Sequence, residues 1–206
     1  MPSLQEEIIL SLFQIIGALA DAASAQDTYA PGHRLQASQI SRSLAQIMGF
    51  EGEDVDAIRM ASMLHDIGAM YVPREILSKP GPLTDEEFVI VRNHVGWGAQ
   101  MLSGVAFPWP VLPIILQHHE RLDGSGYPAG LSAGQIILEA QVLAVADVME
   151  AMTAPRPWRP AIPAPEALAE IVRDRGVKFD ASVVDACVEL YTNQTYRLDP
   201  EYYGRS

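Results

Sequence analysis

The sequence has very little cysteine, since Cys187 is the only one among 206 residues. A single cysteine excludes disulfide bonds within the chain and favours a reducing compartment, so we expect a cytoplasmic protein. Cys187 belongs to an apolar stripe of helical spacing that runs from Val184 to Tyr191. This pattern predicts a small buried core residue.

Basic residues are also scarce. The chain has 14 lysines and arginines against 26 aspartates and glutamates, which gives a formal net charge of −12. Sequence-independent binding to duplex nucleic acid needs clustered lysine and arginine, so the composition argues against this function. A small anionic ligand stays compatible with it, because metal ions and a few arginines reverse the electrostatic field locally.

Long hydrophobic runs are absent. The segment most similar to a membrane span, residues 8–20, is shorter than the ~20 apolar residues a spanning helix needs, and it contains Ser11 and Gln14. Glu6 and Glu7 precede it without lysine or arginine, which is the wrong charge for a signal peptide. We therefore expect an amphipathic N-terminal helix and no membrane span.

The periodic segments of the chain are helical, and none has a convincing strand pattern. Gly49 follows one helix, Asp54 is placed to cap the next, and Gly68 would end that helix in the left-handed conformation. Caps are also expected from Thr84, within a capping box, and from Asp180. The predicted helices span about 4–24, 35–48, 54–68, 84–102, 110–120 (with Pro110 or Pro113 in its first turn), 134–153, 165–174 and 181–194.

Two long loops, 68–83 and 121–133, interrupt this pattern and are rich in proline and glycine. Long loops in a compact helical domain often carry function. We expect one domain over residues 27–206, with residues 1–26 as an N-terminal helix that projects from it. The apolar surface of that helix is wider than one packing face needs, so homodimerisation through it is an open alternative.

Several polar residues stand in apolar surroundings. Asp147 lies in VLAVADVMEAM and His65-Asp66 in MASMLHDIG, where a carboxylate is costly unless a cation or several donors compensate it. Each such residue alone is also compatible with an ordinary core or surface role. Together, two carboxylates and five histidines suit a pair of divalent metal ions with one bridging carboxylate. The candidate ligands are His33, His65, Asp66, His94, His118, His119 and Asp147.

The order of these residues and the sequence between them resemble the HD-GYP family, a branch of the HD phosphohydrolases, over roughly residues 27–190. The matching stretches are DTYAPGH (27–33), HDIG (65–68), ILSKPGPL (76–83), RNHVGWGAQML (92–102), HHERLDGSGYPAGL (118–131), VLAVADVMEAM (142–152), RPWRPA (156–161) and GVKFDASVVDA (176–186). The resemblance implies an all-α HD-domain helical bundle with long active-site loops. It also implies hydrolysis of cyclic di-GMP to linear pGpG, GMP or both.

The resemblance further implies two metal ions, usually iron or manganese; the ligand types also suit zinc. One metal would be held by His33, His65, Asp66 and Asp147, and the other by His94, His118 and His119. Asp66 would bridge the two, with Asp66 and His65 at the catalytic centre. Members with a third metal have a glutamate where this chain has Tyr29, so we expect two. A water shared by the metals would supply the attacking hydroxide.

The substrate contacts implied by the resemblance lie in two loops. Tyr127, with Gly126 beside it, would face the ligand from the GYP loop, and Arg156 and Arg159 would contact its phosphates through their planar donor forks. Trp158 replaces the more usual tyrosine and is either a packing residue or a stacking surface for guanine.

One departure from the family pattern concerns Ala69. The family usually reads HDIGK, and this chain reads HDIGA, so the lysine that would touch the scissile phosphate is missing. Lys79 cannot be assumed to substitute for it. A second hypothesis is therefore a domain that binds cyclic di-GMP, or a diguanylate-cyclase (GGDEF-type) partner, with little catalysis. A third, another HD reaction such as monophosphate hydrolysis or diiron oxygenation, is disfavoured by the GYP loop and RPWRP.

Overall fold

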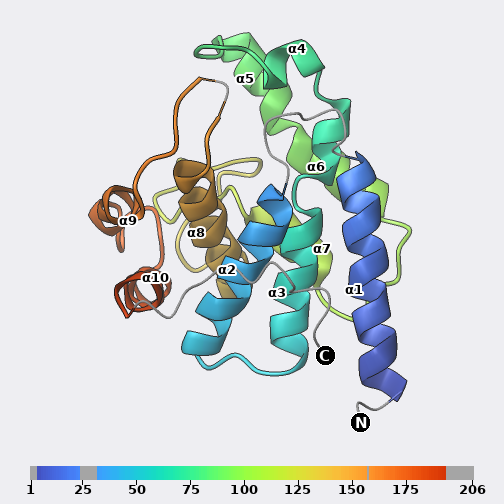
Figure 1. The fold of residues 1–206 in the computed structure, drawn as a ribbon. Coiled ribbons are helices and arrows are strands. Elements are labelled where there is room, and N and C mark those ends of the chain that lie inside the picture. The colour runs from blue at the N-terminus through green and yellow to red at the C-terminus, as the bar shows by residue number, and fades with distance from the viewer. Residues whose placement is uncertain (1–3, 24–31, 157, 194–206) are drawn as a thin grey trace.

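The computed structural model describes residues 4–23, 32–156 and 158–193, and these form helices joined by loops, with isolated bridges but no strand (Figure 1). The predicted all-α fold is confirmed. The helices are α1 (Leu4–Ala23), α2 (His33–Ile47), α3 (Glu53–Leu64), η1 (Ile67–Tyr71), α4 (Arg74–Leu77), α5 (Asp85–Arg92), α6 (His94–Leu102), α7 (Val111–Gln117), α8 (Leu138–Thr153), α9 (Ala164–Arg173) and α10 (Ala181–Thr192).

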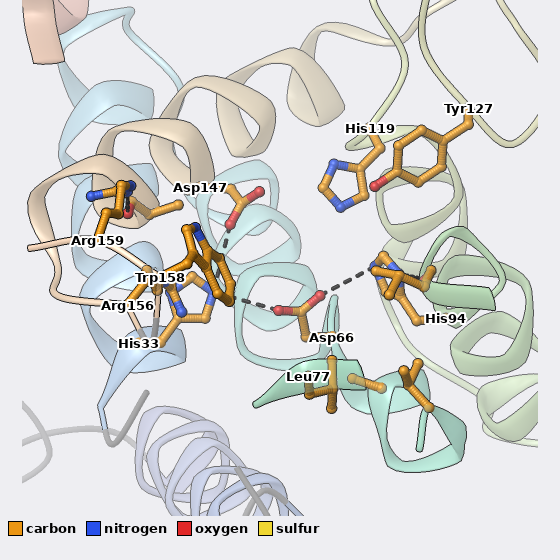
Figure 2. A pocket seen from close by; sticks show the side chains of 14 residues that line it. His33, Asp66, Leu77, His94, His119, Tyr127, Asp147, Arg156, Trp158 and Arg159 are labelled. Atoms are coloured by element: carbon orange, nitrogen blue, oxygen red, sulfur yellow. Dashed lines mark hydrogen bonds and ion pairs between the residues drawn. The ribbon is translucent and has the colours of Figure 1, made fainter. Parts of the chain in front are cut away.

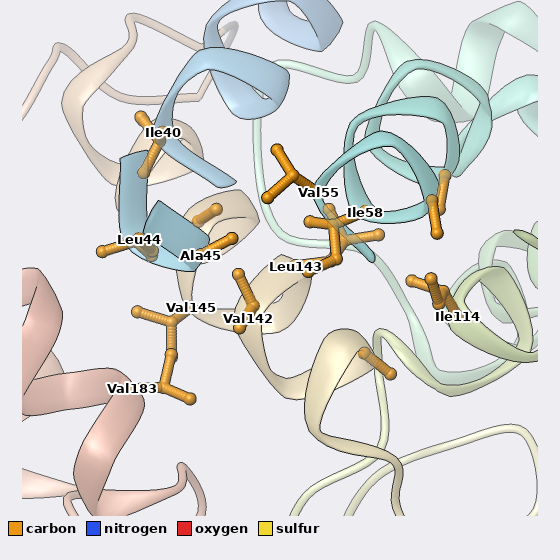
Figure 3. Packing of buried hydrophobic residues seen from close by; sticks show 14 of the residues in the cluster. Ile40, Leu44, Ala45, Val55, Ile58, Ile114, Val142, Leu143, Val145 and Val183 are labelled. Atoms are coloured by element: carbon orange, nitrogen blue, oxygen red, sulfur yellow. The ribbon is translucent and has the colours of Figure 1, made fainter. Parts of the chain in front are cut away.

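The core forms where α2, α3 and α7 pack around α8 (Figures 1 and 3). Each helix contributes a fully buried aliphatic side chain: Leu44 from α2, Ile58 from α3, Ile114 from α7 and Leu143 from α8. Burying one such side chain contributes roughly 1.5–3 kcal/mol. This core therefore fixes the helices that carry most of the candidate metal ligands.

Helix α1 packs against α3 and η1 through one face only. Phe13 on that face is buried, with its ring stacked 6.0 Å from that of Trp109. The other face leaves Ile8, Ile15 and Leu19 more than half exposed, as the width of its apolar surface predicted. Among the described residues, no helix is both long enough and apolar enough to cross a membrane.

The helix predicted over 84–102 is divided in two at Asn93. The predicted capping box is present at its start, where the Thr84 hydroxyl accepts from the backbone N–H of Glu87. The division coincides with the carbonyl of Val91, which accepts a hydrogen bond from the His94 ring at 2.6 Å. A side chain thus takes up a carbonyl that a continuous helix would use in its backbone ladder.

Other helix boundaries also differ from the prediction. The first helix of the domain begins at His33 instead of residue 35, and α8 begins at Leu138 instead of residue 134. The prediction that Asp54 caps α3 is wrong, because Gly52 occupies the cap position and Asp54 lies in the first turn, where a carboxylate favours the helix dipole. The predicted Asp180 cap is confirmed, since its carboxylate accepts from the N–H of Ser182 at 2.8 Å.

Gly68 does not end a helix in the left-handed conformation, so that prediction is wrong. It lies inside η1, buried against α6, where a Cβ atom would come within 2.0 Å of the His94 carbonyl oxygen and 2.4 Å of the Gly98 nitrogen. Both neighbours are backbone atoms that cannot move aside. Glycine is therefore required for the close approach that brings Asp66 next to His94.

We expect Gly68→Ala to destabilise the protein by about 3 kcal/mol, the upper end of the usual cost of overpacking. Gly96→Ala is the matched control, because a Cβ atom there meets nothing within 4 Å and Gly96 also lies in α6. Alanine in a helix interior is favoured over glycine, so the control should gain roughly 0.5–1 kcal/mol. Urea unfolding of both variants measures the difference, and equal midpoints would contradict the packing argument.

Candidate metal centre

Asp66 lies at the centre of the site, near His33 of α2, His65 at the end of α3 and His94 of α6; Figure 2 shows it between His33 and His94. Its Oδ2 atom is 3.5 Å from Nε2 of His33 and 3.3 Å from Nε2 of His65. Its Oδ1 atom is 3.2 Å from Nε2 of His94. The two carboxylate oxygens therefore face different sets of histidines, which is the arrangement of a bridging ligand.

Three of the histidines, His65, His94 and His118, are oriented in the same way. Each ring Nδ1 donates a hydrogen bond to the backbone carbonyl three residues earlier, at 2.8, 2.6 and 2.6 Å respectively. The proton on Nδ1 leaves Nε2 with a free lone pair, and all three Nε2 atoms are buried without a hydrogen-bond partner. A buried unpaired polar atom costs about 1–3 kcal/mol, which a bound metal ion would offset.

All seven predicted ligands come together. The donor atoms of His33, His65 and Asp66 lie within 4.8 Å of one another, as do those of Asp66, His94, His118 and His119. Asp147 completes the first group, with Oδ1 3.5 Å from Nε2 of both His33 and His65. Imidazole nitrogens and carboxylate oxygens suit divalent transition metals, so these residues fit two ions held by a shared carboxylate.

Glu150 is a residue of this site that the sequence interpretation missed. Its carboxylate is buried and accepts hydrogen bonds from Nδ1 of His33 and from the Arg156 guanidinium, the latter at 3.0 Å. It follows Asp147 by one turn of α8 in a segment that is otherwise apolar, and this spacing was the available signal. Glu150 therefore orients His33 in the way carboxylates orient metal-binding histidines.

We expect Glu150→Gln to weaken metal binding by about 10- to 100-fold. Both donors meet the same oxygen, Oε2, so glutamine would keep an acceptor there but would lose the negative charge that holds the His33 ring and the Arg156 guanidinium. Glu139→Gln, which changes a half-buried glutamate in the first turn of the same helix, is the control. Competition with a metal-sensitive dye measures the affinities, and an unchanged affinity of the Glu150 variant would show that His33 is oriented without it.

The two halves of the site differ in electrostatics. Burial alone would lower the pKa of His33, but hydrogen bonds that its ring donates to the carboxylates of Asp66 and Glu150 raise it to about 9. The pKa values of His65 and His94 are raised against burial mainly by Asp66. Burial lowers the pKa of His119 to about 3, because the raising effect of Asp147 and Asp66 is smaller than the cost of burying a charged ring. In the metal-free site the rings of His33, His65 and His94 therefore hold protons more readily than those of His118 and His119, whose pKa values are lowered.

Metal binding is consequently expected to release protons. The folded pKa of His33, about 9, exceeds its ordinary 6.5, so its contribution to the metal-free fold is complete below pH 6.5 and lost as pH rises through 9. A metal needs the neutral ring, so its affinity should increase over the same interval. Calorimetric titrations in buffers of different ionisation enthalpy count the protons, and a flat affinity between pH 6.5 and 9 would contradict this assignment.

The Tyr127 side chain stands over the histidine half of the site. Its ring stacks on that of His119 at 4.6 Å, the Arg92 guanidinium lies 5.1 Å from its centroid, and its hydroxyl points into the cavity (Figure 2). Burial raises the pKa of this phenol above its usual value. The hydroxyl therefore remains a hydrogen-bond donor at neutral pH.

The GYP loop, residues 121–133, is held in place by hydrogen bonds and backbone packing within the protein. The Glu120 carboxylate accepts from the N–H groups of Ala129 at 2.7 Å and Leu131 at 2.9 Å. Gly124 has a positive φ of 78°. Gly126 does not, and glycine is needed there because a Cβ atom would lie 2.4 Å from Cα of Glu120. Gly126 thus packs on backbone and is not among the residues that line the cavity.

A cavity of about 290 Å³ opens beside the ligands and includes Arg156 and Arg159 in its lining. Both arginines also have protein partners. Arg156 is paired with Glu150, and Arg159 donates to carbonyls at the end of α8, including that of Met152 at 2.9 Å. The rest of the wall is apolar and includes Ala69. Lys79 is paired with Glu87 at 2.6 Å and does not line the cavity.

The chain is similar to known proteins over most of its length. The family model described as HD domain matches residues 17–183. A cyclic di-GMP phosphodiesterase response regulator from Xanthomonas campestris pv. campestris is 36% identical over 193 residues, covering 89% of this chain and 51% of the relative. A cyclic di-GMP phosphodiesterase from Thermotoga maritima is 38% identical (87% and 49%). A 3′3′-cGAMP-specific phosphodiesterase from Vibrio cholerae is 33% identical (93% and 44%). The chain thus spans about half the length of the curated relatives it matches.

Solved structures share the fold. An HDG"Y"P protein from Bdellovibrio bacteriovorus aligns with a TM-score of 0.69 at 22% identity, covering 90% of this chain and 64% of the other. A cyclic GMP-AMP-specific phosphodiesterase from V. cholerae aligns with the same TM-score at 17% identity, covering 95% and 51%. At these identities the likeness extends to the fold alone.

Proposed function

Since the chain belongs to the HD domain family and carries the HD-GYP motifs, we propose that it is a metal-dependent phosphodiesterase that hydrolyses cyclic di-GMP to pGpG, GMP or both. The observation that carries the proposal is the set of three buried, unpaired Nε2 atoms around Asp66. The seven ligands would hold two divalent ions, which by the family resemblance would be iron or manganese, and zinc is compatible with the ligand types.

The chemistry needs a nucleophile at neutral pH and neutralisation of the phosphodiester charge. Two divalent ions supply both, since they lower the pKa of water and polarise phosphoryl oxygens. Asp66 fixes the spacing of the two ligand groups, with His65 beside it at 3.3 Å. Tyr127 directs a protonated hydroxyl at the phosphate, and Arg156, held by Glu150, places positive charge at the cavity wall.

Anaerobic purification followed by metal analysis and turnover of cyclic di-GMP on the same sample tests the proposal. We expect about two metal equivalents and a linear product. Mononucleotides and a generic phosphodiester serve as comparison substrates. Hydrolysis of one of these while cyclic di-GMP stays intact would contradict the substrate, and protein without bound metal would contradict the mechanism.

Ala69 favours a second candidate function, binding of cyclic di-GMP without rapid turnover. It lines the cavity where the family has a lysine, and the nearby Lys79 is occupied by Glu87. Tight binding with no linear product over hours would favour this function. A diguanylate-cyclase (GGDEF-type) partner belongs to the same hypothesis and stays a prediction, as does the cytoplasmic location.

The division into residues 1–26 and 27–206 is likewise a proposal. The exposed Ile8, Ile15 and Leu19 on α1 would form the contact of a homodimer. Light scattering at high protein concentration tests it, and a monomer would count against it.

A further inference from the structure

His118 and His119 are consecutive residues, and both belong to the same group of candidate metal ligands. Helix α7 ends at Gln117, so the two histidines and Glu120 lie in the turn that follows it. Consecutive side chains on a helix point about 100° apart, but these two rings lie 4.0 Å apart with their planes inclined by 40°. The shape of this turn therefore decides whether both rings reach one metal ion.

Each backbone carbonyl of this turn accepts a hydrogen bond from outside it. Nη1 of Arg121 donates to the carbonyl of His118 at 3.1 Å and to that of Glu120 at 2.7 Å. The carbonyl between them, that of His119, accepts from the N–H of Tyr127 at 3.2 Å, where the GYP loop returns. Carbonyls at and beyond the end of a helix have no partner within the helix. Arg121 and the returning loop therefore fix the turn together.

A second contact holds Arg121 from the segment between α9 and α10. Its guanidinium carbon lies 5.0 Å from the centre of the Phe179 ring, within the ~6 Å range of a cation–π interaction. Phe179 is buried, and the carbonyl of its neighbour Lys178 accepts from the N–H of Leu122 at 3.0 Å. Burial lowers the pKa of the Arg121 guanidinium, but an arginine stays charged at neutral pH. Removing a cation from water is costly, and its contacts with the two carbonyls and the ring compensate that cost.

We infer that Arg121 is a positioning residue for the metal ion assigned to His94, His118 and His119. Its guanidinium holds the turn after α7 in the shape that presents both rings, and Phe179 holds the guanidinium. The other ion takes its ligands from α2, α8 and the end of α3, so it does not depend on this turn. The inference rests on the two-metal site of the proposed function and deepens it, because it makes one ion depend on a residue between α9 and α10.

The test is a titration of metal-free protein with zinc, in which the affinity of each ion is measured separately. Arg121→Met keeps an unbranched side chain but removes the charge and the donors. It should weaken one zinc ion by about 10- to 100-fold, the usual effect of losing a residue that orients a metal ligand, and leave the other unchanged. Arg173→Met is the matched control, because Arg173 is exposed on α9 and paired with Glu170, and it should keep both affinities.

Histidine ring NMR during the same titration identifies the ion that is affected. In the Arg121 variant, the rings of His94, His118 and His119 should respond only at the higher zinc concentration. The other two of the five histidine rings should respond as they do in wild type. A general loss of stability would weaken both ions alike, so equal weakening overturns the inference, as do two unchanged affinities.

Phe179→Leu tests the same contacts in case the Arg121 variant does not fold. Leucine keeps an apolar side chain at this buried position but offers no ring face to the guanidinium. Loss of a cation–π contact changes an equilibrium by roughly 2- to 30-fold, so the same zinc ion should weaken by a factor in that range. Unchanged affinities for both ions, or weakening of the other ion, would overturn the inference.

The wild-type titration separates the inference from the function on which it rests. Two zinc ions bound by wild type, with no selective loss in either variant, would leave the two-metal site standing and overturn only the role of Arg121. Wild-type protein that binds fewer than two zinc ions would overturn both. Selective loss of one ion in the variants supports the role of Arg121 whether or not cyclic di-GMP is hydrolysed.

Discussion

Replacing Ala69 with lysine is expected to increase the rate of cyclic dinucleotide hydrolysis by about 10²- to 10³-fold, the usual worth of one donor directed at developing negative charge. Ala69 lies in η1, three residues after Asp66, and lines the cavity. It is half-buried at the edge of the open cavity, so a longer side chain can extend into it. An ammonium group there would add positive charge to the cavity that Asp66 and His94 also line, where a phosphate would bind.

The measurement is single-turnover hydrolysis, which separates the chemical step from product release. Ala69→Met is the matched control, because methionine fills the same part of the cavity without a charge. The lysine variant should be faster than both wild type and the methionine variant, with an unchanged metal content. Equal rates for all three would show that the missing lysine does not limit this chain.

Most of the helical fold follows from local signals. The Thr84 capping box and the Asp180 cap are satisfied by residues within one turn, so spacing alone identifies them. Gly68 shows where such reasoning fails. A glycine after an apolar helix has the pattern of a left-handed terminator, but the constraint on it comes from the backbone of α6, some thirty residues away, as the contact with His94 shows. Long-range packing of this kind has no local signature.

The seven candidate metal ligands were predictable from the sequence, but the residue that orients one of them was not. The seven candidate ligands carry a recognisable order, and the structure brings them together although His33 and Asp147 are far apart in the sequence. Glu150 was missed, because a glutamate near the end of a helix usually faces solvent and its spacing from Asp147 does not by itself identify a partner. Only the packing of α2 against α8 places the ring of His33 on its carboxylate. A residue that hydrogen-bonds a metal ligand is therefore placed by the packing of the helices, which the sequence alone does not show.

Changing Asp66 to asparagine is expected to reduce metal content below two equivalents and turnover by at least about 10³-fold. Asparagine has nearly the same shape but only one oxygen, so it cannot face His65 and His94 with a negative charge on each side. Asp66 is also the main group that raises the pKa of His94 against burial. The substitution should therefore lower the pKa of that ring in the metal-free protein, which histidine NMR titration measures independently of activity.

Asp185→Asn is a suitable control, because Asp185 is exposed on α10 and paired only with Arg175 among the contacts described. It should retain both metals and full turnover. If the Asp66 variant also kept two metals and turned over within about tenfold of wild type, Asp66 could not be the shared ligand. The bridge would then have to come from Asp147, the only other carboxylate among the seven candidate ligands, although it faces the His33 and His65 half of the site and not His94.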